Sequence, residues 1–408
     1  MNPFESTLLR RLAQSHGTPL WVYDADTVRA RIASLRPFDV IRFAQKANSN
    51  LHLLRLMRER GVKVDAVSLG EIERALAAGY PAQDIVFTAD LFDHATLARV
   101  AADRITVNAG SIDMLEQLGQ RSSGHRVWLR INPGFGHGHS NKTNTGGEHS
   151  KHGIWHADLP LALAAIAAHG LQLVGLHMHI GSGVDYGHLE QVCSAMVELA
   201  ARVPDRIEAI SAGGGLSIPY RAGEPRIDIA HYFSLWDAAR RRISAARGHA
   251  IELEIEPGRF LVAEAGVLLA EVRAVKTMGA NHFVLVDAGF NDLMRPAMYG
   301  SHHGMVLLPG DDAPRRLRPT VVAGPLCESG DVFTQAEGGV VLTRDLPEAR
   351  VGDLLVFEDA GAYGASMSSN YNSRPLLPEV LVDGGQSRLI RRRQTVQELL
   401  SLENLEAT

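Results

Sequence analysis

The chain has 408 residues, of which 45% are hydrophobic and 21% charged, and its formal net charge is −5. The length predicts about two domains, and the composition is that of a soluble globular protein with a sizeable core. Positive and negative residues are interspersed, which argues against a nucleic-acid surface because such a surface needs a basic field.

Cysteine usage and the start of the chain bear on its compartment. Only two cysteines occur, Cys193 and Cys327, which disfavours a disulfide framework and favours a reducing compartment. The first residues, MNPFESTLLRRL, include Glu5 and lack the apolar core of a signal peptide. No run of about 18 apolar residues appears, so no membrane-spanning helix is predicted. We therefore expect a cytoplasmic protein.

Strand-like apolar runs alternate with amphipathic helical stretches through the first two thirds of the chain. The helical stretches, such as GEIERALAAGY and LEQVCSAMVELAARV, repeat their apolar residues every three or four positions, and Cys193 in the second is interpreted as a core residue. Eight strands are predicted, at 40–46, 62–68, 84–90, 104–110, 126–133, 171–180, 206–215 and 251–257.

This alternation predicts an α/β fold with parallel strand pairing. Eight such units over ~220 residues suggest a (β/α)8 barrel of the TIM type, which typically takes about 250 residues. A doubly wound open sheet is the alternative.

The pattern changes after residue 265. Short alternating runs such as VLLAEVRAV, HFVLVDAG and DLLVFED follow, punctuated by turn residues, and they predict an antiparallel β domain. The strand-like segment GTPLWVYDA near the N-terminus is expected to pair with that domain. We therefore predict a barrel over residues 27–265 and a β domain made of residues 1–26 and 266–408.

In a barrel of this kind, residues at the C-terminal ends of the strands face the active site. The first strand ends on Lys46, within FAQKANSN, and the second contains Asp65. A lysine at a strand end is most often a surface residue. A lysine desolvated in the barrel mouth would instead have a lowered pKa and could form a Schiff base.

Later strand ends carry groups suited to an anion. Gly213, Gly214 and Gly215 end the seventh strand, where bare backbone lets N–H groups approach a phosphate. Ser182, which follows the sixth strand, adds a hydroxyl donor, and Arg259 adds positive charge for that anion or for a substrate carboxylate. Alternatively, the glycine triplet simply forms a turn.

Three acids alternate along the eighth strand, Glu252, Glu254 and Glu256, so all three face one side. They mark an exposed strand face or, alternatively, they place Glu256 in the mouth, where a carboxylate keeps a pyridine nitrogen protonated. Lys46, the glycine triplet and Glu256 together favour pyridoxal 5'-phosphate (PLP) as the cofactor.

A metal site is the rival interpretation of HMH at residues 177–179. Two histidines two positions apart lie on one strand face, as in metal-dependent hydrolases built on barrels. Such a site needs further histidine and aspartate ligands, and the other strand ends offer only Asp65 and Glu256. We therefore predict no metal, and we expect His179 to stack on a flat aromatic cofactor.

Six segments of the chain, taken together, resemble the diaminopimelate decarboxylase family, PLP-dependent decarboxylases with an alanine-racemase-like barrel. The segments are FAQKANSN, HMHIGSG, SAGGGLSIPY, EIEPGRF, GPLCESGD and DAGAYGASMSSNYNSRPLLPEVL. The resemblance covers residues 20–400 approximately and keeps the family's motif order. The long loop at 134–153 resembles the bacterial branch, and the sequence does not indicate its role.

The resemblance implies roles for individual residues. Lys46 binds PLP covalently, His179 stacks on its ring, and Glu256 is the partner of the pyridine nitrogen. The remaining implied cofactor contacts are Asp65, Ser182, Gly213, Gly214, Gly215, Gly258, Arg259 and Tyr363. The implied substrate contacts are Arg259, Arg295, Tyr299, Glu328 and Tyr363. Cys327 is implied as a catalytic residue that, with Glu328, comes from the second subunit of a head-to-tail homodimer.

The substrate that the resemblance implies has an amino-carboxylate group at each end. Arg295 can grip the distal carboxylate as a planar fork, and Glu328 can accept hydrogen bonds from the distal ammonium. The expected reaction is the decarboxylation of meso-2,6-diaminopimelate to L-lysine and CO2, the last step of bacterial lysine biosynthesis. Lys46 and Cys327 are both candidates to return a proton to the α carbon.

Two further hypotheses stay open at this point. A related decarboxylase would act on another basic amino acid or on a carboxylated polyamine, which would leave Arg295 and Tyr299 without an evident use. A non-catalytic PLP-carrying protein on the same fold would be expected to have lost Lys46, Glu256 or Cys327, and all three are present.

Overall fold

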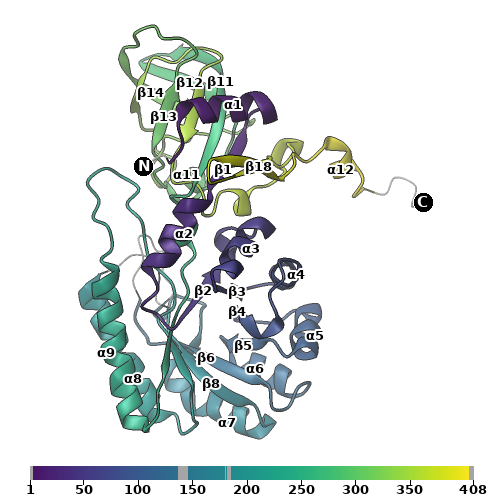
Figure 1. The fold of residues 1–408 in the computed structure, drawn as a ribbon, viewed down its shortest axis with the longest axis vertical. Coiled ribbons are helices and arrows are strands. Elements are labelled where there is room, and N and C mark those ends of the chain that lie inside the picture. The colour runs from purple at the N-terminus through teal and green to yellow at the C-terminus, as the bar shows by residue number, and fades with distance from the viewer. Residues whose placement is uncertain (1–2, 137–145, 180, 182–184, 404–408) are drawn as a thin grey trace. The chain divides into compact units, whose positions relative to one another are not determined.

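The computed structural model describes residues 3–136, 146–179, 181 and 185–403. The chain forms two compact units (Figure 1). The β unit comprises Met1–Val28, Ile218–Pro225 and Val262–Thr408, and the barrel unit comprises Arg29–Ser217 and Arg226–Leu261. Within the described part of the chain, no helix is both long and apolar enough to cross a membrane.

The barrel unit is built on eight parallel strands that close on themselves. Their order is β5-β4-β3-β2-β10-β9-β8-β6, and β5 pairs back with β6. The strands are β2 (Val40–Ala44), β3 (Lys63–Ala66), β4 (Ile85–Ala89), β5 (Thr106–Ala109), β6 (Arg126–Asn132), β8 (Gln172–His177), β9 (Ala209–Ser211) and β10 (Glu252–Ile255), and the short β7 (Ile154–Trp155) also pairs with β6. Each predicted strand region contains one of the eight, so the (β/α)8 barrel is confirmed and the doubly wound sheet is wrong.

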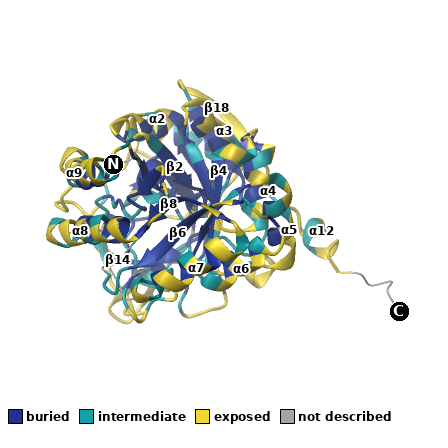
Figure 2. Cartoon of the chain, turned by 90° about the horizontal axis from the view of Figure 1, so that it is seen from below, coloured by how far each residue is buried: buried dark blue, intermediate teal, exposed yellow. Residues whose placement is uncertain are grey.

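Helices surround this ring of strands, and their outer faces are exposed while the strands are buried (Figure 2). The helices of the barrel are α2 (Ala25–Ser34), α3 (Leu51–Glu59), α4 (Leu69–Ala77), α5 (His94–Asp103), α6 (Ile112–Gly119), α7 (Leu159–His169), α8 (Tyr186–Arg202), α9 (Ile229–Arg247) and α10 (Arg259–Val262). Single 3-10 turns are η1 (Gln45–Ala47), η2 (Ala82–Asp84) and η4 (His156–Asp158).

Polar side chains cap the helices that follow the strands, in some cases across very short connections. Ser68 accepts the backbone N–H of Glu71 at the start of α4, only two residues after β3 ends. Ser111 does the same at the start of α6, two residues after β5. Such caps satisfy N–H groups that have no partner inside the helix. The other side-chain caps are Asn50, Asp93, Asp185 and Asp228.

The β unit is a mixed sheet with the order β15-β14-β12-β11-β1-β17-β18, with β16 pairing both β11 and β13. Its strands are β1 (Leu20–Asp24), β11 (Gly266–Met278), β12 (Asn281–Val286), β13 (Met305–Leu308), β14 (Leu317–Ala323), β15 (Arg344–Pro347), β16 (Leu354–Phe357), β17 (Glu379–Asp383) and β18 (Gln386–Arg391). Its helical segments are α1 (Ser6–His16), α11 (Arg295–Tyr299), η5 (Ala365–Met367), η6 (Tyr371–Ser373) and α12 (Val396–Leu400).

The predicted pairing of the N-terminal strand is confirmed, since β1 lies between β11 and β17. Two pairings are parallel, β1 with β17 and β12 with β14, and the others are antiparallel. The sheet is therefore antiparallel-rich rather than purely antiparallel. In both parallel pairs the two strands are not consecutive in the chain, so no tight hairpin turn fixes their relative direction.

The sequence analysis did not predict α1, which covers one face of this sheet. Leu9 and Leu12 are buried on the helix and join a cluster with Leu20 of β1 and Val267 of β11. Full burial of a leucine side chain stabilises a fold by roughly 1.5–3 kcal/mol. The helix is thus part of the core of the β unit.

Candidate active site

Each strand of the barrel carries a polar side chain that is at most 8% exposed. Buried polar side chains on barrel strands are unusual, because such barrels are mostly packed with branched apolar side chains, and those near the C-terminal strand ends are candidates for a site. The residues are Arg42 on β2, Asp65 on β3, Thr88 on β4, Asn108 on β5, Arg130 on β6, His177 on β8, Ser211 on β9 and Glu254 on β10. Of these residues, only Asp65 was given a role from the sequence, and His177 was considered only as part of a metal site. Glu254 was considered part of an exposed strand face, which is wrong, since it is buried against Arg42.

Glu256, directly after β10, is held by the neighbouring strands and is 9% exposed. Its Oε2 lies 2.8 Å from Nε2 of His177, and the hydroxyl of Ser211 donates to Oε1 at 2.9 Å. Burial alone would raise the pKa of Glu256, but His177, Ser211 and Arg42 outweigh that effect and lower it to about 2. The group is therefore a fixed, ionised carboxylate inside the barrel.

The pKa of Asp65 is shifted in the opposite direction from that of Glu256. Burial raises its pKa first, and the negative charge of Glu256 adds to this, so that the pKa reaches about 8 against the opposing effects of Lys46 and Thr88. Its Oδ1 is buried and has no hydrogen-bond partner in the described part of the chain. Asp65 thus holds its proton more tightly than an exposed aspartate while Glu256 is ionised, and such divergent pairs are typical of active sites.

Lys46 lies at the same edge of the barrel as Glu256. It is the middle residue of η1, directly after β2, and its side chain is exposed. The first barrel strand, β2, pairs with the last, β10. Just beyond this pairing, the N–H of Ala44 donates to the carbonyl of Pro257 at 3.2 Å. A Cβ at Gly258 would stand 3.2 Å from the Ala44 oxygen, so glycine lets this turn pack closely on β2.

The glycine triplet lies against the same set of residues. A Cβ on Gly213, Gly214 or Gly215 would stand 2.3–2.6 Å from a backbone oxygen, so close packing requires all three glycines. The N–H of Gly213 donates to Ser211 Oγ at 3.1 Å, and the N–H of Gly214 donates to His179 Nδ1 at 3.2 Å. Two of the three N–H groups proposed to cradle a phosphate therefore already have acceptors in the chain.

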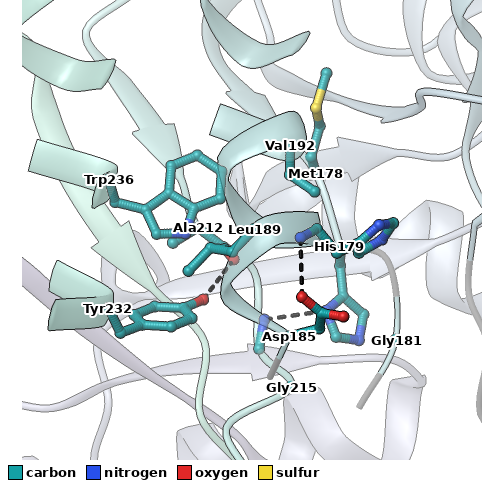
Figure 3. A pocket seen from close by; sticks show the side chains of 12 residues that line it. Met178, His179, Gly181, Asp185, Leu189, Val192, Ala212, Gly215, Tyr232 and Trp236 are labelled. Carbon is teal, nitrogen blue, oxygen red and sulfur yellow. Dashed lines mark hydrogen bonds between the residues drawn. The ribbon is translucent and has the colours of Figure 1, made fainter. Parts of the chain in front are cut away.

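A small pocket adjoins the triplet and is lined by His179, Gly214, Gly215 and the aromatic residues Tyr232 and Trp236 of α9 (Figure 3). Desolvation, followed by the positive charges of Arg130 and Lys46, holds the pKa of His179 well below its usual value. His179 is thus a neutral imidazole whose Nδ1 accepts from the triplet. Ser182 lies outside the described residues.

The described ends of the 134–153 loop are fixed by two residues next to the barrel strands. Asn132, the last residue of β6, accepts the N–H groups of Gly134 and Gly147 and donates to the carbonyls of Gly147 and His152. Asp90, directly after β4, lies 2.7 Å from His152 Nδ1 and accepts from Gly153. The sequence analysis did not identify these anchors.

The β unit carries the remaining predicted residues. Arg295 begins α11 and is buried, while Tyr299 at the end of that helix is half-buried. Tyr363 is a non-glycine residue with a positive φ of 57°, a conformation that costs energy and is concentrated at functional sites. Cys327 and Glu328 are both exposed. Arg259, also half-buried, begins α10 in the barrel unit.

Hydrogen bonds within the β unit hold the turn that bears Cys327 and Glu328. The Cys327 N–H donates to the side-chain oxygen of Asn372 at 3.0 Å. Asp331 accepts the N–H of Leu326 at 2.8 Å and donates its own N–H to the Glu328 carbonyl. The turn is therefore fixed at both ends by polar contacts.

The residues of the barrel fit PLP on several independent observations. Glu256 is an ionised carboxylate in a dry setting, which is the partner that a protonated pyridine nitrogen requires. Lys46 lies at the same edge, the triplet offers backbone where no Cβ can stand, and a buried oxygen of Asp65 has no partner among the described residues. By contrast, the described residues include no group of three or more His, Cys, Asp or Glu side chains able to hold a metal.

Comparisons with known proteins agree with this chemistry. A family model described as "Pyridoxal-dependent decarboxylase, pyridoxal binding domain" matches residues 27–263. The chain is 68% identical over 404 residues to the diaminopimelate decarboxylase of Escherichia coli K12, covering 97% of this chain and 96% of that protein.

Solved structures are similar over nearly the full length. A crystal structure of diaminopimelate decarboxylase superposes with a TM-score of 0.95 at 67% identity and covers 98% of this chain and 96% of that one. The Helicobacter pylori diaminopimelate decarboxylase complexed with L-lysine gives a TM-score of 0.85 at 31% identity, with 96% and 98% covered.

The barrel, its buried carboxylate and the matching family model define a pyridoxal-dependent decarboxylase, with PLP as its cofactor. Within that class, the chain belongs to the diaminopimelate decarboxylase family. The resemblance seen in the six sequence segments is confirmed.

Proposed function

We propose that the protein is a carboxy-lyase that converts meso-2,6-diaminopimelate to L-lysine and CO2, the last step of bacterial lysine biosynthesis. The observation that carries the proposal is the ionised Glu256, fixed between His177 and Ser211 inside a barrel of this family. The 68% identity to the Escherichia coli enzyme and the L-lysine complex of the Helicobacter pylori enzyme support the choice of substrate and product.

The barrel supplies the groups for the chemical step. When bound, PLP accepts the electron pair that remains when the carboxylate leaves as CO2. Lys46 is the residue whose amine would hold the cofactor covalently. Glu256, which is ionised, would face the pyridine nitrogen and keep a proton on it. Lys46 and Cys327 are the two candidates that return a proton to the α carbon.

Further residues position the cofactor. We assign stacking on its ring to His179, whose neutral imidazole is already oriented by Gly214. The remaining proposed contacts are Asp65, Ser182, Gly213, Gly214, Gly215, Gly258, Arg259 and Tyr363. Because Gly213 and Gly214 already donate within the chain, the phosphate depends more on the other donors of this set.

The β unit supplies the groups that recognise the substrate's unreacted end. Arg295, with Tyr299, binds the distal carboxylate, and Glu328 accepts from the distal ammonium. Arg259 and Tyr363 complete the proposed contacts. We assign Cys327 and Glu328 to the partner's active site in a homodimer, which agrees with their exposure on a turn that is itself held in place. In this scheme residues 27–265 bind PLP, and residues 1–26 and 266–408 serve the dimer and the substrate.

The proposed location is the cytoplasm. Cys193 and Cys327 are both free thiols, one buried and one exposed, which suits a reducing compartment.

Purified protein with added PLP tests the function directly. Incubation with meso-diaminopimelate is expected to release CO2 and L-lysine in equal amounts, and no release would refute the proposal. A parallel panel of ornithine, arginine and a carboxylated polyamine addresses the alternative. Faster turnover of any of these would favour a related decarboxylase of another basic substrate.

A further inference from the structure

The guanidinium of Arg295 is held by two side chains of its own unit. Its Nη1 lies 3.0 Å from Nε2 of His303, and its central carbon lies 4.8 Å from the centre of the Tyr220 ring. Arg295 is 6% exposed and His303 is 2% exposed. Tyr220 comes from the segment Ile218–Pro225, which interrupts the barrel sequence and belongs to the β unit.

The partners of His303 fix its protonation state. A guanidinium can only donate hydrogen bonds, so Nε2 of His303 must accept from Arg295. On the other side of the ring, Nδ1 lies 2.9 Å from the backbone carbonyl of Glu358, which can only accept. His303 is therefore neutral, with its proton on Nδ1.

The ring of Tyr220 contacts both His303 and Arg295. It meets the His303 ring edge-on, with centroids 5.6 Å apart and planes at 78°. The same ring lies beside the Arg295 guanidinium, where the quadrupole of an aromatic face attracts a cation. Three segments of the β unit thus converge on one cation: residues 218–225, α11, and the loop between α11 and β13.

The contacts with His303 and Tyr220 bear on how Arg295 can recognise a carboxylate. An arginine side chain has several rotatable bonds, and recognition of a carboxylate by two parallel N–H groups needs the guanidinium plane to be fixed. His303 accepts a hydrogen bond from Nη1, one of the nitrogens of the guanidinium, and so fixes the orientation of its plane. The Tyr220 ring limits movement of the guanidinium out of that plane.

We propose that His303 and Tyr220 are positioning residues that orient Arg295 and thereby set the preference for ligands with a distal carboxylate. This inference rests on the proposed function, in which Arg295 binds that carboxylate.

Three substitutions separate the acceptor from the rest of the imidazole. His303→Gln places an amide oxygen near the position of Nε2 and keeps an acceptor for Arg295. His303→Asn is shorter, so it can retain the donor toward the Glu358 carbonyl but not the acceptor for Arg295. His282→Asn is the matched control, because His282 is buried on β12 in the same unit.

The readouts are kinetics with meso-diaminopimelate and competitive inhibition by two ligands. L-lysine keeps the distal amino-carboxylate end of the substrate, whereas cadaverine keeps the carbon chain and both amines but has no carboxylate. His303→Asn should raise KM and the inhibition constant of L-lysine about tenfold or more, as for loss of a hydrogen bond to a charged group. It should leave kcat within a few-fold and cadaverine inhibition unchanged.

His303→Gln and His282→Asn should both behave like the wild type. Equal weakening of L-lysine and cadaverine by His303→Asn, or no weakening of either, would overturn the proposal. So would a defect in His303→Gln as large as that in His303→Asn.

A second pair keeps the test decisive if His303→Asn fails to fold. Tyr220→Phe retains the ring and should be neutral, while Tyr220→Leu should weaken L-lysine several-fold more than cadaverine. The double variant Arg295→Leu/His303→Asn should be no worse than Arg295→Leu alone, since the two act as one unit. Additive losses would contradict the proposal.

Failure of the proposed function would look different. A wild-type protein that releases no CO2 from meso-diaminopimelate refutes the function before any variant is compared. A wild-type enzyme that is active, with Arg295→Leu failing to distinguish L-lysine from cadaverine, would refute the role of Arg295 itself.

Discussion

The barrel unit and the β unit hold their polar groups in different ways. In the barrel, the groups stand on paired strands and contact one another from strand to strand, as Glu256 does with His177 and Ser211. In the β unit, they stand on a five-residue helix and on turns, as Arg295 and Cys327 do. Strand register fixes the first set at once, whereas each member of the second set needs partners of its own.

This difference matches a division of chemical labour. The groups on strands suit a step that is common to PLP-dependent decarboxylases, where a fixed charge must stay in place. The groups on turns, apart from the candidate proton donor Cys327, are proposed to select among substrates, which can change when a single turn changes. The comparison implies that loss of a barrel charge disturbs stability or chemistry, and that loss of a β-unit contact disturbs selection.

The buried pair at β2 and β10 gives the largest expected effect on stability. Arg42 donates to both oxygens of Glu254 at 3.0 Å, and both side chains are at most 7% exposed. Arg42→Met should lower the free energy of unfolding by about 3–5 kcal/mol because it leaves a buried carboxylate unpaired. Urea unfolding measures this loss.

Two further variants control for the change in side chain. Arg42→Met/Glu254→Leu should recover most of the loss. Arg126→Met, which breaks the exposed pair with Glu208, should cost less than about 1 kcal/mol. If Arg42→Met and Arg126→Met lowered the free energy of unfolding equally, the stability of the barrel would not depend on pairing of its buried charges.

The next effect is on catalysis. Glu256→Gln removes the fixed negative charge but keeps the size of the side chain, so kcat should fall by about 10²–10³. Steady-state kinetics with meso-diaminopimelate measures the change. Glu252→Gln, at an exposed position of the same strand, is the control and should match the wild type. A Glu256→Gln enzyme within a few-fold of wild-type kcat would mean that this carboxylate does not sustain the reaction.

The smallest expected effect, taken over a single pH unit, is the pH dependence that Asp65 gives to the PLP-free chain. Its folded pKa of about 8 lies above the model-compound value of 3.8. Between these values the unfolded chain releases a proton that the folded chain keeps, so stability falls as pH rises, by at most about 1.4 kcal/mol per pH unit.

Asp65→Asn removes this titration and should flatten stability between pH 5 and pH 8. Unfolding in urea at several pH values is the measurement. An unchanged slope in the variant would show that Asp65 does not retain its proton in the folded chain.

Much of the barrel could be predicted from the sequence, because alternating runs of strand and helix recur eight times. The polar layer was also visible in principle: runs such as VIRFA, TVNA and WLRIN each place one or two polar residues among apolar ones. We predicted Asp65 and Glu256 because they stand at strand ends. Arg42 and Arg130 lie within their strands, and Ser211 ends the short β9; all three were missed, since their burial follows only from closure of the barrel.

The β-unit residues were predicted only by resemblance of motifs. No periodicity places Arg295 or Cys327, because α11 is short and the turn around Cys327 depends on Asn372, 45 residues later. Tyr220 and His303 were missed for the same reason: they lie far apart in sequence, and only the fold brings both to Arg295.

The central claim is that the amine of Lys46 carries PLP in the barrel mouth, and chemical mapping tests it most directly. The chain has five lysines, Lys46, Lys63, Lys142, Lys151 and Lys276, so the site of attachment can be read without ambiguity. Borohydride reduction of the PLP-loaded protein, followed by proteolysis and mass spectrometry, should find the pyridoxyl phosphate on Lys46 alone. A label on any other lysine, or none at all, would contradict the account.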